Sequence, residues 1–109
     1  MPQDLIVMLT TLPDALAAQA FAARVVDARL AACATCLAPA LSTYRWSGNI
    51  ETASEVPVLF KTSLECADAL ETFIAENHPY DVPEIIRWHA TAAPAYAQWV
   101  AAETTPGAL

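Results

Sequence analysis

The pattern of apolar positions divides the first third of the chain into a buried strand and a helix. Residues 5–9 are a continuous apolar run, which is typical of a strand covered on both faces. Thr11 and Asp14 have the spacing of a capping box, so a helix is expected to start there and to end near Ala32. Apolar residues at steps of three and four predict its buried face: Leu16, Ala20, Ala23, Val26 and Leu30.

The middle of the chain predicts two strands joined by a tight turn. Residues 33–47 are compatible with a strand, with Pro39 at a bulge or an edge position. Gly48 and Asn49 form a typical turn pair, so the chain is expected to reverse there as a hairpin. The return strand ends at residues 61–62, and three apolar residues line one of its faces: Val56, Val58 and Phe60.

The remaining residues predict a helix, a strand and a second helix. Ser63 can cap the first of these helices, and Pro79 ends it. Its inner face is expected to carry Leu64, Ala67, Leu70 and Ile74. Residues 82–90 predict the last strand, and Pro94 opens a short helix. That helix is expected to pack through Tyr96, Trp99 and Val100, and the tail from Thr104 onward is expected to be frayed.

This order of elements is typical of an α+β protein with the ferredoxin-like, or split β-α-β, arrangement. It reads β-α-β-β-α-β plus a C-terminal helix, which predicts an antiparallel sheet with helices on one face. The 109 residues fit a single domain over 1–109, with 105–109 as a frayed tail.

The hairpin between the second and third strands is too long for so small a domain. Strands of about 13 residues extend over roughly 40 Å, whereas a compact chain of this length is about 35 Å across. We therefore expect the hairpin and the helix-free face of the sheet to be covered by another subunit. The aromatic residues expected at this interface are Tyr44, Trp46 and Trp88.

Composition and charge exclude several classes of protein. The chain is 56% hydrophobic and carries a net charge of −7, with only five Lys and Arg. Five scattered cations do not form the basic surface of a nucleic-acid-binding protein, so no nucleic acid is expected as a partner. No apolar run is long enough to span a membrane, and the N-terminus lacks the pattern of a signal peptide. We expect no membrane association, a cytoplasmic location and reduced cysteines.

Four short motifs, in order along the chain, resemble the CutA divalent-cation tolerance family. They are LAAC at 30–33, YRWSG at 44–48, FKT at 60–62 and HPYDVPEII at 78–86. The resemblance covers about residues 5–103 and makes the whole chain a CutA-like domain. It implies a ferredoxin-like subunit, a homotrimer built through the long hairpin, and a link to copper and other divalent cations.

The resemblance also suggests metal ligands. Some members carry a cysteine where this chain has Thr10, and a second histidine where it has Asn77. The polar residues that still match are His78 and Glu84, whose imidazole and carboxylate suit copper(II) or zinc. Two protein ligands are few for a tight site. In the simpler interpretation His78 holds the turn by hydrogen bonds, and Glu84 pairs with an arginine.

A second hypothesis is a binding site for a small anionic effector between subunits. Its candidate residues are Arg45, Lys61, Tyr80 and Arg87. Trimeric PII-type signalling proteins share this subunit fold and use such clefts, which is an analogy of fold. The simpler interpretation is that these cations form salt bridges with Glu51, Glu55 or Glu84 within the subunit.

Two further possibilities, a functional pair of thiols and an enzymatic activity, have less support in the sequence. Cys33 and Cys36 form a C-x-x-C pair, but residues three apart on a strand face opposite sides, so buried structural cysteines are the expectation. The chain has no phosphate-binding glycine loop, nucleophile elbow or three-ligand metal motif. We therefore expect no enzymatic activity and no organic cofactor.

Overall fold

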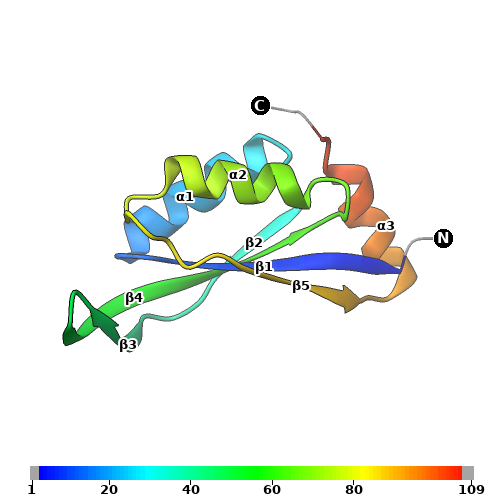
Figure 1. Ribbon diagram of the computed structural model, residues 1–109. Coiled ribbons are helices and arrows are strands. Elements are labelled where there is room, and N and C mark those ends of the chain that lie inside the picture. The colour runs from blue at the N-terminus through cyan, green and yellow to red at the C-terminus, as the bar shows by residue number, and fades with distance from the viewer. Residues whose placement is uncertain (1–2, 107–109) are drawn as a thin grey trace.

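The computed structural model describes residues 3–106 as one antiparallel sheet with three helices (Figure 1). The elements in chain order are β1 (Asp4–Leu12), α1 (Ala15–Asp27), β2 (Cys33–Cys36), β3 (Ala40–Trp46), β4 (Asn49–Thr62), α2 (Ala67–Asn77), β5 (Ile86–Thr91) and α3 (Pro94–Glu103). The strand order is β2-β4-β1-β5, and β3 pairs with β4 in the hairpin. The ferredoxin-like arrangement is thus confirmed, with the predicted strand over 33–47 interrupted between β2 and β3 around Pro39.

The core lies between the sheet and the two helices α1 and α2, which cover the same face (Figure 1). Val56, Val58 and Phe60 point into it from β4, as predicted, and are at most 3% exposed. Phe21 of α1 packs edge-on against Phe73 of α2, with ring centroids 5.7 Å apart. The opposite, helix-free face of the sheet keeps exposed apolar side chains.

The predicted start and end of α1 are wrong. Thr11 belongs to β1, and Asp14 is the N-cap, accepting a 2.8 Å hydrogen bond from the Ala17 amide. The helix ends at Asp27, and Arg29 follows with a φ of 59°, a left-handed conformation typical of helix ends.

The predicted buried face of α1 is also wrong. Leu16 is 80% exposed and Val26 is 39% exposed. The core instead receives Ala18, Phe21, Ala22 and Val25. Leu30 is buried as predicted, but from the loop after the helix.

The second helix and the last strand start later than predicted. Ser63 accepts a 3.2 Å hydrogen bond from the Cys66 amide in the turn that precedes α2. Leu64 lies in that turn and is 48% exposed, whereas Leu70 and Ile74 are buried as predicted. Strand β5 starts at Ile86.

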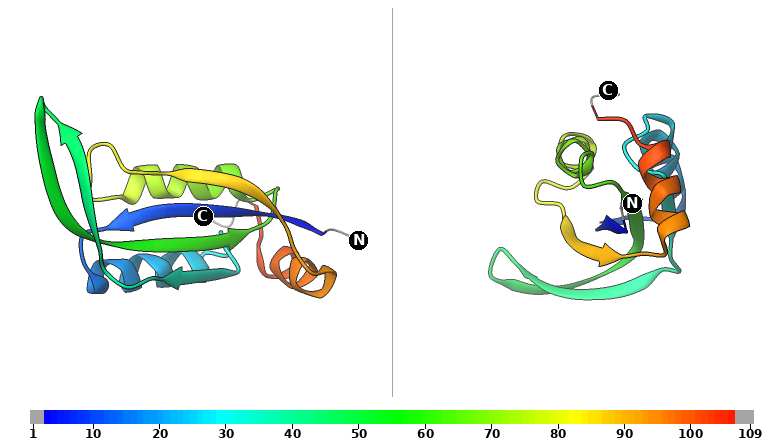
Figure 2. Two further views of the ribbon diagram at one scale, coloured as in Figure 1. Left: turned by 90° about the horizontal axis from the view of Figure 1, so that it is seen from below. Right: turned by 90° about the vertical axis from the view of Figure 1, so that its right-hand side faces the viewer.

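The hairpin turn lies one residue earlier than predicted. Ser47 and Gly48 are the two central residues, with φ values of 50° and 81°, and Trp46 pairs with Asn49 across the turn. Positive φ at both positions is the signature of a type I′ turn. The described chain measures 48 × 26 × 23 Å, and Figure 2 shows the β3–β4 hairpin extending beyond the rest of the sheet, as expected.

The end of the described chain is held against the domain, in contrast to the predicted frayed tail. Val100 is buried as predicted, while Tyr96 and Trp99 remain partly exposed and lie against each other. The Thr104 hydroxyl donates to the Val100 carbonyl at 2.9 Å, and the Thr105 amide donates to the Arg29 carbonyl at 3.0 Å. Residues 107–109 lie outside the described part. No helix within residues 3–106 is long and apolar enough to cross a membrane.

Candidate functional site

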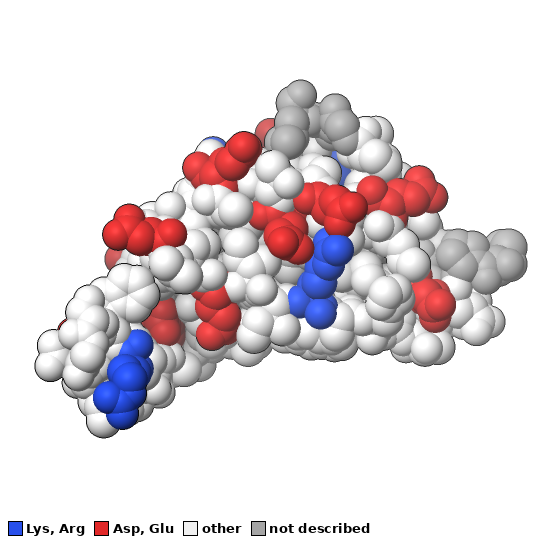
Figure 3. All heavy atoms as spheres, viewed as in Figure 1, with Lys and Arg blue, Asp and Glu red and all other residues white. Residues whose placement is uncertain are grey.

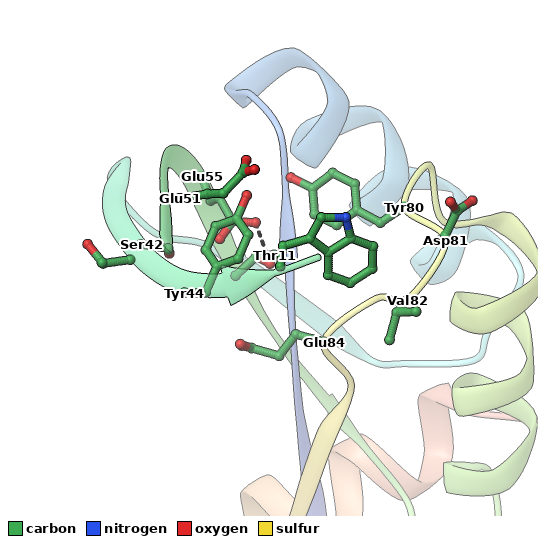
Figure 4. A pocket seen from close by; sticks show the side chains of 11 residues that line it. Thr11, Ser42, Tyr44, Glu51, Glu55, Tyr80, Asp81, Val82 and Glu84 are labelled. Atoms are coloured by element: carbon green, nitrogen blue, oxygen red, sulfur yellow. Dashed lines mark hydrogen bonds between the residues drawn. The ribbon is translucent and has the colours of Figure 1, made fainter. Parts of the chain in front are cut away.

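A pocket of about 650 Å³ lies where the hairpin meets the end of β1 and the loop between α2 and β5 (Figure 4). Its lining comes from three segments distant in sequence: Thr11 of β1; Ser42, Thr43, Tyr44, Trp46, Glu51 and Glu55 of the hairpin; and Tyr80, Asp81, Val82 and Glu84 of the loop. The β3–β4 register places Tyr44 directly opposite Glu51 on the hairpin wall.

The pocket is acidic and partly aromatic. Four carboxylates line it, from Glu51, Glu55, Asp81 and Glu84, and its lining contains no Lys, Arg or His. Such a concentration of one charge in a concave surface attracts cations and repels anions. We refer to this site as the acidic pocket.

Glu55 is the best-anchored of these carboxylates. Its Oε2 accepts a 3.0 Å hydrogen bond from the Thr11 hydroxyl. Glu55 also acts on Tyr80, because burial together with the interaction with this carboxylate raises the pKa of Tyr80 to about 12. These contacts join the hairpin to β1 and to the loop, so they fix the shape of the acidic pocket.

His78 holds the start of the loop against β1. Its Nδ1 accepts a 3.1 Å hydrogen bond from the Tyr80 amide, which leaves the ring proton on Nε2 to donate to the Thr11 carbonyl at 2.8 Å. Burial lowers the pKa of His78, opposed by the Thr11 carbonyl and the charge of Glu55. The imidazole is therefore neutral in this subunit, and both of its nitrogens form hydrogen bonds that hold the loop against β1.

The two predicted metal ligands are thus not brought to the same cavity. Glu84 lines the acidic pocket, whereas His78 is not among the lining residues. Within residues 3–106, no three His, Cys, Asp or Glu side chains are placed to enclose a metal ion. One subunit alone offers open carboxylates rather than a complete coordination sphere.

The four residues of the predicted effector site lie apart in one subunit. Arg87 faces α2 and pairs with Asp68 at 2.9 Å. Lys61 donates to the Thr35 hydroxyl at 2.8 Å, and Tyr80 lies in the acidic pocket. The salt bridges expected to Glu51, Glu55 or Glu84 do not form among the described residues, and Arg87 pairs with Asp68 and Glu71 of α2 instead.

The cysteines of the C-x-x-C pair do not form a common site. Cys33 pairs with Lys61 and Cys36 with Val58 across β2 and β4, so the side chains face opposite sides of the sheet, as predicted. Cys33 is half-buried, and Cys36 is exposed rather than buried.

Three acidic pocket residues were not predicted as a site: Glu51, Glu55 and Asp81. Glu51 and Glu55 are four apart on one strand, which places them on the same face, so alternation along the return strand could have suggested the pair. The approach of residue 81 to that face depends on the loop path, which no sequence pattern reveals.

Comparisons with known proteins agree with this geometry. The sequence profile of the CutA1 divalent ion tolerance protein family matches residues 6–103. The chain is 46% identical over 81 residues to the divalent-cation tolerance protein CutA of Yersinia pestis, which covers 74% of this chain and 68% of that protein.

Two solved structures superpose closely on this chain. The crystal structure of CutA from Xylella fastidiosa superposes with a TM-score of 0.88 at 37% identity, covering 93% of this chain and 98% of that one. A protein described as the PII-like protein CutA from Nostoc, in its apo form, superposes with a TM-score of 0.86 at 28% identity, covering 92% and 97%.

Proposed function

The chain belongs to the CutA1 divalent ion tolerance family, and from this premise we propose that it is a cytoplasmic homotrimer that binds divalent metal ions. Copper(II) and zinc are the ions to test first. The protein acts in tolerance of these ions without catalysing a reaction and without an organic cofactor, as a single domain over residues 1–109.

The observation that carries the metal proposal is the acidic pocket. Its four carboxylates have no Lys or Arg partner among the described residues, so their mutual repulsion favours uptake of a cation. Glu84 is open to the pocket and is the first candidate ligand. His78 becomes a ligand only if it releases the Tyr80 amide from Nδ1 or the Thr11 carbonyl from Nε2.

The number of available ligands sets the expected strength of binding. Carboxylates alone suit hard or borderline ions and leave the remaining coordination positions to water or to another subunit. We therefore expect binding in the micromolar range or weaker, with a site completed at a subunit junction.

The homotrimer proposal is supported by the apolar surface that one subunit leaves exposed. On the helix-free face, Ile86 is 49% exposed and Trp88 is 43% exposed. On the hairpin, Trp46 is 47% exposed and Ile50 is 68% exposed. Large apolar side chains that are exposed on the sheet and on the hairpin favour an interface with other subunits.

Native mass spectrometry tests both parts of the proposal. Chelator-treated protein is titrated with copper(II) and with zinc, and we expect a trimer that takes up about one ion per subunit. Glu84→Ala is expected to reduce uptake, and His78→Ala reports whether the imidazole takes part. Glu76→Ala, an exposed carboxylate on α2, is the control and should bind as wild type does. A trimer that remains free of metal at micromolar concentrations would contradict the metal proposal.

The alternative is a PII-like scaffold that binds a small anionic effector between subunits. The Nostoc protein described as PII-like supports it. It requires Arg45, Lys61, Tyr80 and Arg87 to converge from different subunits. Thermal stability that rises with an anionic metabolite and does not change with copper would favour this alternative.

A further inference from the structure

The acidic pocket is larger than a metal ion requires. Its volume is about 650 Å³. A divalent ion with a full shell of six waters occupies roughly 200 Å³, because each water takes about 30 Å³. Cavities of about 300–1,000 Å³ are typical of sites that bind small organic molecules. The acidic pocket therefore has room for an organic ligand.

The charge of the acidic pocket is divided between two walls. Glu51 and Glu55 belong to the hairpin strand β4, whereas Asp81 and Glu84 belong to the loop between α2 and β5. Within residues 3–106, no three His, Cys, Asp or Glu side chains are grouped closely enough to hold one metal ion. A small ion thus meets only part of this charge, because Coulomb attraction falls with distance. An extended ligand with two or more cationic groups reaches both walls.

Aromatic side chains line the same pocket. Tyr44 and Trp46 come from the hairpin, and Tyr80 comes from the loop. Figure 4 shows the Tyr80 side chain reaching from the loop toward the hairpin, where Tyr44 and Glu55 lie. The faces of aromatic rings attract ammonium groups and pack against methylene groups. A lining of rings and carboxylates therefore suits an alkyl ammonium, whereas a metal ion uses only the oxygen atoms.

We propose that the acidic pocket binds a linear aliphatic polyamine, with ammonium groups at both carboxylate walls and the methylene chain against the aromatic rings. Such a ligand supplies the positive charge that the pocket lining lacks, since no Lys, Arg or His contributes to it. The inference adds a second class of ligand to the proposed function. It rests on the proposed function only in requiring the same uncompensated carboxylates, so polyamines and divalent metal ions should compete for the pocket.

The acidity of the whole chain makes a matched control necessary. The net charge is −7, and Figure 3 shows acidic side chains spread over one face of the molecule. Such a surface attracts any polycation weakly and without specificity. Binding in the pocket differs from this attraction because it depends on particular carboxylates, on a ring face and on the number of charges on the ligand.

Isothermal titration calorimetry of the chelator-treated full chain tests the inference. The probe is spermidine, a linear triamine, at an ionic strength of about 0.15 M, where long-range attraction is screened. We expect about one spermidine per subunit. Butylamine has a single ammonium group and should bind at least about tenfold more weakly, because it reaches one wall only. Saturating zinc should raise the apparent Kd of spermidine.

Variants of the pocket separate the two classes of ligand. Tyr44→Leu removes a ring face and should weaken spermidine binding about twofold to fivefold, with a smaller effect on zinc. Tyr44→Phe keeps the ring and should restore spermidine binding. Glu84→Gln removes charge from the loop wall and should weaken both ligands by up to about fivefold. Glu76→Gln makes the same change of charge on α2, outside the pocket, and should weaken neither.

The outcomes distinguish this inference from the proposed function. Uptake of zinc or copper(II) without spermidine binding would overturn the inference alone. Spermidine binding without metal uptake would support the inference and contradict the metal proposal. Equal spermidine affinity in Glu84→Gln and Glu76→Gln, or in Tyr44→Leu and Tyr44→Phe, would indicate attraction to the whole acidic surface and overturn binding in the pocket. Circular dichroism confirms that each variant is folded.

Discussion

Thr10 carries a polar atom that the fold leaves without a partner. It is fully buried on β1, and its hydroxyl has no hydrogen bond among the described residues. An unpaired buried hydroxyl destabilises a protein by about 1–3 kcal/mol. Replacing it with a methyl group in Thr10→Val should therefore raise the free energy of unfolding by about 1 kcal/mol, measured by urea denaturation at fixed protein concentration.

Thr62 is the matched control for this substitution. It is also fully buried and lies on the neighbouring strand β4, but its hydroxyl donates to the Leu30 carbonyl at 2.6 Å. Thr62→Val leaves that carbonyl unpaired and should lower the free energy of unfolding by about 1–2 kcal/mol. Equal unfolding midpoints for the two variants would contradict the inference that the Thr10 hydroxyl is unpaired and the Thr62 hydroxyl is paired.

His78 should make stability depend on pH. Its pKa is lowered in the folded state by burial, so the unfolded chain takes up the proton first as the pH falls. The contribution of His78 is complete above the unfolded pKa of about 6.5 and is lost as the pH falls towards the lower folded value. The free energy of unfolding should therefore decrease between pH 7.5 and pH 5.

The variant His78→Gln isolates this contribution. The variant keeps every carboxylate of the wild type, so the difference between the two pH profiles reports the imidazole. We expect the variant to be less stable at neutral pH and to show a shallower decline on acidification. Parallel profiles for the two proteins would show that His78 does not carry the effect.

The contacts of His78 also show why the site was only partly predictable. The sequence predicted that His78 and Glu84 lie in one turn, and both residues do lie in the segment between α2 and β5. The direction of the imidazole, however, is set by the Thr11 carbonyl, 67 residues away in the chain. A motif records the spacing between residues but not which backbone groups a long-range fold will bring to them.

At the scale of the element, residue spacing again predicted some buried faces correctly, whereas long-range packing decided the others. In strand β4 the large apolar residues Val56, Val58 and Phe60 recur at every second position, so its buried face was evident. Helix α1 is rich in alanine, and at least two of its faces satisfy helical spacing. The core selects the face that contains Phe21, because that ring fills the space beside Phe60 and Phe73.

The hairpin turn yields a prediction of its own. Gly48 has a φ of 81°, and a Cβ added there meets no atom within 4 Å. Gly48→Ala should therefore destabilise the hairpin through backbone strain alone, by about 1–2 kcal/mol. Ser47→Gly relieves a positive φ at the preceding residue and should not destabilise the protein in this way. Thermal denaturation of both variants at one protein concentration compares their stabilities. An equal loss of stability in the two variants would contradict this prediction.

At the scale of the whole molecule, the exposed apolar residues are of two kinds. Leu16 is 80% exposed on α1 and stands among small or polar neighbours. Trp88 is only 43% exposed, but it lies beside Val7 of β1 on the helix-free face, near Ile86. A single exposed leucine is normal for a monomer, whereas a contiguous apolar face requires cover.

This difference predicts opposite effects for one kind of substitution. Trp88→Asp places a charge in the centre of the proposed interface, where burying it without a partner is costly, so the trimer should dissociate into folded subunits. Leu16→Asp exchanges a more exposed apolar residue for the same charge on the outer helix layer, and its assembly should be unchanged. Sedimentation velocity measures the oligomer, and circular dichroism measures the fold. An intact Trp88→Asp trimer would contradict an interface at Trp88, and dissociation of Leu16→Asp would show that the outer helix layer takes part in the assembly.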